Sequence, residues 1–178
     1  MTDSQLFEEK SVDPTPSKRP VLLLVLVILT AINIGIASLG SLSGMLGVVP
    51  DQQMIKSTKL DFAKMRTQLE QANAEDFIYI IDQMEGVTLN MFRNFQAYNS
   101  LQFLFLVIGF VGIVLMYRAK KLGFHFYIIY TLGTTFLPYF FYPLSGIPTI
   151  FTIFGILYGG FWVFLYSRNL HWLQDWFV

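Results

Sequence analysis

The sequence predicts an all-α integral membrane protein with four transmembrane helices and an extracytoplasmic pair of amphipathic helices between the first two. Three observations lead to this fold class. Only 13% of the 178 residues are charged, whereas a typical soluble domain has about 25%. Apolar runs long enough to cross a bilayer recur along the chain, and the mean hydropathy is +0.52. Every charged residue lies between or beside these runs, so none is left for the hydrocarbon core.

The first span is predicted at 20–47, after a disordered cytoplasmic tail at 1–19 that carries Pro and Ser but no apolar periodicity. Lys18 and Arg19 directly precede the span and favour a cytoplasmic location for its start. A cleaved signal peptide is the alternative, with a weak small-residue site at Ala37-Ser38-Leu39. The apolar run is longer than the usual h-region and follows an acidic tail, so we expect an uncleaved signal anchor.

Residues 48–99 are predicted to be extracytoplasmic and to form two amphipathic helices. Pro50 ends the first span, and Asp51 is suited to cap the helix that follows. Apolar residues then recur every three or four positions in two stretches, separated weakly at Asn73-Ala74. No strong helix breaker follows before Leu101, which allows the second helix to run unbroken into the second span.

Three further spans are predicted at 100–117, 122–142 and 149–167. The basic loop at 118–121 is short and therefore indicates the cytoplasmic side. The turn at 143–148 is tight and has Pro at both ends, so the third and fourth spans should be antiparallel neighbours.

Residues 168–178 are predicted to form a short helix on the cytoplasmic membrane surface, because Trp residues concentrate at membrane interfaces. Its interfacial aromatic residues are Trp172 and Trp176. Both termini are then cytoplasmic. The residues that set this topology, or bind lipid headgroups, are Lys18, Arg19, Arg118, Lys120, Lys121 and Arg168.

Small residues within the spans suggest faces where helices approach closely. Two G-x-x-x-G patterns occur, one in the first span and one in the fourth, and they favour pairing either within this chain or with a partner. The alternative is that membrane helices are simply rich in glycine. The candidate helix-packing residues are Gly35, Gly40, Gly44, Gly109, Gly112, Gly155 and Gly159.

The intramembrane polar candidates are few. Asn33 is near the middle of the first span and should bond another helix, since an unpaired amide in lipid costs a few kcal/mol. Gln102 is the corresponding residue of the second span. His125 is expected at headgroup depth, where a hydrogen bond to lipid or backbone suits it better than catalysis.

No catalytic, metal-binding or cofactor-binding pattern is predicted. His125 and His171 have no suitably spaced acidic partner, and the sequence contains no Cys. The acidic residues Glu75, Asp76, Asp82 and Glu85 favour a solvated helix face over a cation site. A net charge of zero argues against a nucleic-acid partner.

The layout resembles that of small four-span bacterial inner-membrane proteins of uncharacterised activity. The likeness rests on the basic loop leading straight into an aromatic span, Arg118-Ala-Lys-Lys-Leu-Gly-Phe-His-Phe-Tyr127, and on the turn from Pro143 to Pro148. It covers spans two to four. The resemblance implies no particular activity. The small size and the uncleaved, cysteine-free topology predict a bacterial inner-membrane location.

These features favour a non-enzymatic accessory or scaffold subunit of a larger membrane complex, acting through helix packing in the bilayer and through its extracytoplasmic helices. The expected partners are membrane lipids and other integral membrane proteins, with homo-oligomerisation left open. The alternative is a small oligomeric channel or uncoupled transporter. Its polar path would be lined by Asn33, Gln102, Thr131, Thr134 and Thr135. An enzyme ranks third, because no nucleophile–base pair or pair of acids occurs at the interface.

Overall fold

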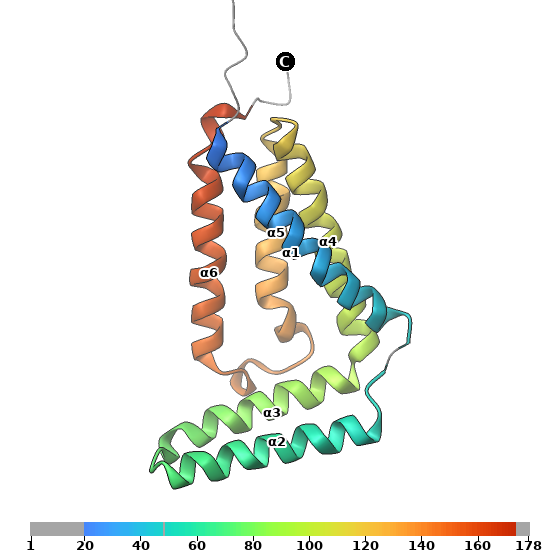
Figure 1. The fold of residues 1–178 in the computed structure, drawn as a ribbon, viewed down its shortest axis with the longest axis vertical. Helices are drawn as coiled ribbons and strands as arrows, with labels where there is room; N and C mark the ends of the chain where they lie inside the picture. The colour runs from blue at the N-terminus through green and yellow to red at the C-terminus, as the bar shows by residue number, and fades with distance from the viewer. Residues whose placement is uncertain (1–19, 48, 174–178) are drawn as a thin grey trace, which may run out of the picture.

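The computed structural model describes residues 20–47 and 49–173, and this part of the chain is helical without a strand (Figure 1). The predicted all-α class is therefore confirmed. The α-helices are α1 (Val21–Met45), α2 (Gln52–Gln71), α3 (Ile78–Arg93), α4 (Phe95–Tyr117), α5 (Leu122–Phe136) and α6 (Thr149–Ser167). Short 3₁₀ helices are η1 (Glu75–Phe77), η2 (Leu137–Phe140), η3 (Leu144–Gly146) and η4 (Leu170–Trp172).

Four helices form a bundle with two distinct ends (Figure 1). The start of α1, the α4–α5 turn and η4 lie at one end, which we call the basic end because Arg118, Lys120 and Arg168 are there. The α2–α3 hairpin and the loop 137–148 lie at the other, the hairpin end. Helices α5 and α6 are antiparallel neighbours, as the tight turn between them predicted.

Three helical segments are long and apolar enough to cross a membrane: Val21–Met45, Phe95–Tyr117 and Thr149–Trp172. The chain therefore has the character of an integral membrane protein. The third predicted span differs from the expectation, because its α-helix ends at Phe136 rather than Tyr142. Pro138 lacks the N–H that would continue the α-helical ladder, and the chain tightens into η2 instead.

The hairpin helices begin and join as the amphipathic pattern predicted. The carboxylate of Asp51 accepts a hydrogen bond of 2.6 Å from the backbone N–H of Met54, which confirms it as the N-cap of α2.

Ion pairs join the two helices near the far end of the hairpin. Arg66 of α2 donates to Asp82 at 2.7 Å and also to Glu85, both on α3. These hydrogen bonds raise the pKa of Arg66 and favour its charged form. The hydrogen bond to Glu85 has the larger effect.

Helix α3 does not run unbroken into the second span, although the sequence, which has no strong breaker there, allowed it. Asn94 leaves the helical conformation, and α3 turns there to run across the end of the bundle while α4 enters it (Figure 1). The Nδ2 of Asn90 donates to the carbonyl of Phe141 at 2.7 Å, and Asn94 in turn donates to the side chain of Asn90 at 2.6 Å. These tertiary contacts hold α3 against the loop 137–148, which a straight helix could not reach.

Glycine brings α4 and α5 close together. A Cβ on Gly112 would lie 3.0 Å from both the carbonyl oxygen of Gly123 and the backbone nitrogen of Tyr127. A Cβ on Gly123 would lie 2.5 Å from the backbone nitrogen of Met116. Helix α4 also packs along α1, and α6 packs on α5. The core of the bundle is thus built around α4 and α5, with buried residues such as Leu106 and Ile113 from α4.

We predict that Gly123→Ala destabilises the bundle by about 1–3 kcal/mol, because the added methyl meets backbone that cannot rotate away. Gly160→Ala on α6 is the matched control, since no atom lies within 4 Å of its Cβ position and alanine favours helix. Thermal unfolding in mild detergent, followed by tryptophan fluorescence, compares them. Equal unfolding temperatures for the two variants would contradict the close approach.

Candidate functional site

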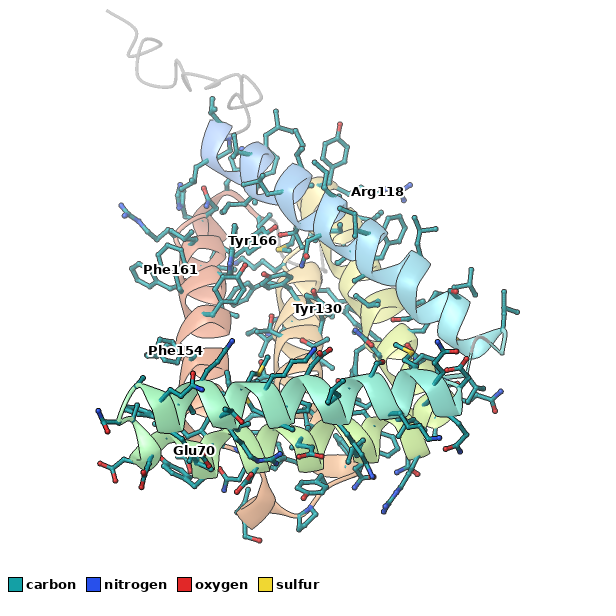
Figure 2. All side chains as sticks on the ribbon, turned by 60° about the horizontal axis from the view of Figure 1, so that its bottom comes forward. Glu70, Arg118, Tyr130, Phe154, Phe161 and Tyr166 are labelled. Carbon is teal, nitrogen blue, oxygen red and sulfur yellow. The ribbon has the colours of Figure 1, made fainter. Side chains whose placement is uncertain are left out.

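A lateral cleft of about 410 Å³ lies between α1, α5 and α6, at the level of the spans. None of its lining residues is charged, and most carry a hydroxyl, an amide or an aromatic ring. Figure 2 shows Tyr130 and Tyr166 in the space enclosed by these helices, whereas Phe154 and Phe161 project outward from α6. The lining residues are Leu29, Thr30, Asn33, Tyr127, Tyr130, Thr131, Thr134, Thr135, Gly155, Tyr158, Gly159 and Trp162.

The cleft closes toward the basic end through one polar contact. Thr30 of α1 and the hydroxyl of Tyr166 of α6 share a buried hydrogen bond of 2.8 Å. The ring of Tyr166 also packs on Tyr127 of α5, with ring centroids 4.5 Å apart. Three helices therefore meet at Tyr166. Beyond this point α1 runs diagonally away from α6, which leaves the front of α5 open (Figure 1).

Asn33 lies on the wall of the cleft and remains exposed. Its side chain interacts with that of Tyr130 on α5, so the structure supplies an interhelical contact of the expected kind. An amide exposed at this depth favours a polar neighbour, because lipid offers no hydrogen bond.

The threonines on the floor of the cleft satisfy part of their own hydrogen-bonding capacity. The Oγ1 of Thr131 donates to the carbonyl of Tyr127, and the Oγ1 of Thr134 donates to that of Tyr130, each at 2.9 Å. Their oxygens keep lone pairs that can accept. The cleft thus offers hydrogen-bond acceptors, the Asn33 amide and aromatic faces to whatever enters it.

Of the polar residues proposed to line a path, four meet at the cleft: Asn33, Thr131, Thr134 and Thr135. Gln102 does not. It is half-buried on α4, away from the cleft lining. The sequence pattern missed the tyrosines and Trp162, since aromatic residues are common in spans and their convergence depends on how α5 and α6 pack.

The candidate packing glycines divide into two groups. Gly109 faces Tyr130 and Ile34, Gly155 faces Thr135, and Gly159 faces Thr131. Gly44 faces Asn99, and Gly112 meets the backbone of α5 as described. Cβ positions at Gly35 and Gly40 have no atom within 4 Å, so these two glycines point out of the bundle.

Two glycines in close contacts were not among the candidates. Gly123 packs on α4, and Gly133 packs against Phe105.

The topology candidates Arg118, Lys120, Lys121 and Arg168 gather at the basic end, where Figure 2 labels Arg118 at the end of α4. The ring of Trp172 packs beside the core cluster at the same end. Lys18, Arg19 and Trp176 lie outside the described residues, as does most of the predicted C-terminal surface helix. Only η4 of that helix is described.

His125 lies in the first turn of α5, directly after the basic loop. His125 contacts the carbonyl of Lys121 through Nδ1 at 3.3 Å, the backbone contact expected for an interfacial histidine. The described residues contain no group of three or more His, Asp or Glu side chains that could hold a metal ion. No family model, curated protein or solved structure matches this chain.

We predict that Tyr166→Phe lowers the unfolding free energy by about 1 kcal/mol, because the hydrogen bond between Thr30 of α1 and the Tyr166 hydroxyl of α6 is lost. Tyr158→Phe on the same helix is the control, since Tyr158 is exposed. Denaturant titration in detergent measures both. A loss no larger in Tyr166→Phe than in Tyr158→Phe would mean that the hydrogen bond contributes nothing to holding α6.

Proposed function

We propose that the chain is a non-enzymatic accessory subunit of a larger membrane complex, and that its cleft receives a transmembrane helix of the partner. The proposal includes four spans, a bacterial inner-membrane location and cytoplasmic termini. One observation carries it: Asn33 is exposed in an uncharged cleft lined by hydroxyls and small residues, at the depth of the spans.

The length of the third segment supports four spans. Together, α5 and η2 run from Leu122 to Phe140 without a charged residue. At 1.5 Å per residue in the α-helix and about 2.0 Å in the 3₁₀ helix, they reach about 30 Å, which matches the hydrocarbon thickness of a bilayer of about 30 Å.

The charge distribution supports the orientation. Arg118, Lys120, Lys121 and Arg168 share one end of the bundle, where short basic segments favour the cytoplasm. The hairpin end would then be extracytoplasmic. This orientation keeps the start of α1 and the end of α6 on the same side as the basic loop.

The shape of the cleft suits a helix. Its floor and one wall carry small side chains, including Thr131, Thr135 and Gly155, which permit close approach. Asn33 and the tyrosine hydroxyls would hydrogen-bond polar groups of the incoming helix, at about 0.6 kcal/mol each in a membrane. The flanking surfaces of α6 are apolar and suited to lipid, as at Phe154 and Leu157.

We predict that a photo-reactive residue at Leu29 crosslinks to one partner protein in native membranes, and that Asn33→Leu lowers co-purification of that protein. Leu29 lines the cleft. Leu157 is the control site, exposed on α6 about 100° around the helix from Tyr158. Tagged chain purified in mild detergent and analysed by mass spectrometry identifies the adduct. Crosslinks to lipid alone from Leu29, or equal protein crosslinks from Leu157, would refute the proposal.

A small oligomeric channel is the second candidate, and the convergence of Asn33, Thr131, Thr134 and Thr135 on one cleft favours it. A second copy could close the open side and form an uncharged polar path. Helices α1, α4, α5 and α6 contain no Asp, Glu, Lys or Arg, which makes proton coupling through them unfavourable.

If the channel is correct, purified protein in liposomes will pass small neutral solutes, and Asn33→Leu will abolish the flux. Gln102→Leu is the control, because Gln102 lies outside the cleft. Stopped-flow light scattering over a panel of solutes measures the permeability. Absence of flux for the whole panel, or equal loss in both variants, would exclude a pore through this cleft.

A further inference from the structure

One face of α3 rests on the end of the bundle. Gln83 donates through Nε2 to the carbonyl of Ser145 at 3.1 Å, and Asn90 donates to that of Phe141 at 2.7 Å. Between them, a Cβ on Gly86 would collide with the hydroxyl of Tyr142. Gln83, Gly86 and Asn90 are three and four residues apart, so they lie on one face of the helix. That face points toward the membrane-spanning bundle.

Tyr79 continues this face beyond the bundle. It lies one turn before Gln83 and therefore points in the same direction, yet 61% of its surface is exposed. Figure 1 shows why, because the hairpin extends past α6 at the end where α3 begins. Tyr79 therefore continues the face that α3 turns toward the bundle, while its own side chain stays mostly exposed.

The loop beneath the bundle adds apolar side chains at the same level. Leu144 precedes Ser145, the partner of Gln83, and is 76% exposed. Phe140 of η2 is 66% exposed. We call Tyr79, Leu144 and Phe140 the rim patch. Tyr79 and Leu144 come from the two elements that the hydrogen bond between Gln83 and Ser145 joins.

We infer that the rim patch inserts into the headgroup–acyl boundary of the bilayer and holds the α2–α3 hairpin flat on the membrane. Tyrosine is suited to this depth, since its ring is apolar and its hydroxyl remains hydrated. The patch adjoins the apolar start of α6, where Ile150 and Phe151 are exposed, so the surface that faces lipid is continuous around this end.

Charge favours a neutral lipid surface over an anionic one. The residues closest in sequence to Tyr79 that carry charge are Glu75, Asp76 and Asp82, all acidic and exposed. Asp82 is paired with Arg66, whereas Glu75 and Asp76 would be repelled by anionic headgroups. Insertion therefore depends on apolar contact, and its depth should not increase with the fraction of anionic lipid. This inference does not depend on the proposed partner helix.

The sequence contains no Cys, so a single introduced cysteine is the sole attachment site for a nitroxide label. Tyr79→Cys and Leu144→Cys place labels in the rim patch. Lys64→Cys is the control: Lys64 is exposed on α2, about 200° around the helix from Phe62, whose side chain is buried. Each full-length variant is placed in phosphatidylcholine nanodiscs, and its accessibility to oxygen and to a nickel chelate is measured by electron paramagnetic resonance.

We expect the ratio of oxygen to nickel accessibility to be several-fold higher at 79 and 144 than at 64, and unchanged when anionic lipid is added. A ratio at 79 equal to that at 64 would overturn the inference. Labels at 79 and 144 that are immobile and closed to both reagents would also overturn it, since protein would then cover the patch. Positions 79 and 144 belong to different elements, so a local disturbance at one site does not affect the other reading. Circular dichroism first establishes that each variant is helical.

Discussion

The close approach of α4 and α5 is the contact on which the rest of the bundle depends. At Gly123 a Cβ would collide with the carbonyl oxygen of Gly112, so a side chain there would force the two backbones apart. Helices in lipid gain little from hydrophobic association with one another, so packing at such contacts must hold them together. Helix α1 then packs along α4, and α6 packs on α5. Every helix of the bundle is therefore attached to this pair.

The position of the cleft follows from that arrangement. Because α1 packs along α4 and α6 packs on α5, the two outer helices meet near Thr30 and Tyr166 and diverge beyond them. The front of α5 is left open, so its half-buried threonines and the exposed Asn33 of α1 border whatever lies alongside. An uncharged polar cleft within the spans is suited to holding a helix or a neutral solute, and both proposed functions start from this property.

The hairpin end obeys a second constraint, since backbone groups of the loop 137–148 need partners. Side-chain amides of α3 supply them at Phe141 and Ser145. These hydrogen bonds hold the hairpin across the bundle, with its charged residues outside the spans. The same placement directs Tyr79 toward the bilayer. Docking of the hairpin and anchoring of its end are thus linked consequences of one set of contacts.

The sequence by itself determined the helical class, the membrane character, the Asp51 cap and the neighbouring α5 and α6, because apolar run length, capping and short turns act over a few residues. It could not determine the break at Asn94, which arises from hydrogen bonds to a loop some fifty residues away. Nor could it show that Gly112 packs against α5 whereas Gly35 has no atom within 4 Å of its Cβ position. Composition within one helix does not specify which face meets another. The convergence of Asn33 with three threonines, and the exclusion of Gln102, were decided by helix crossing alone.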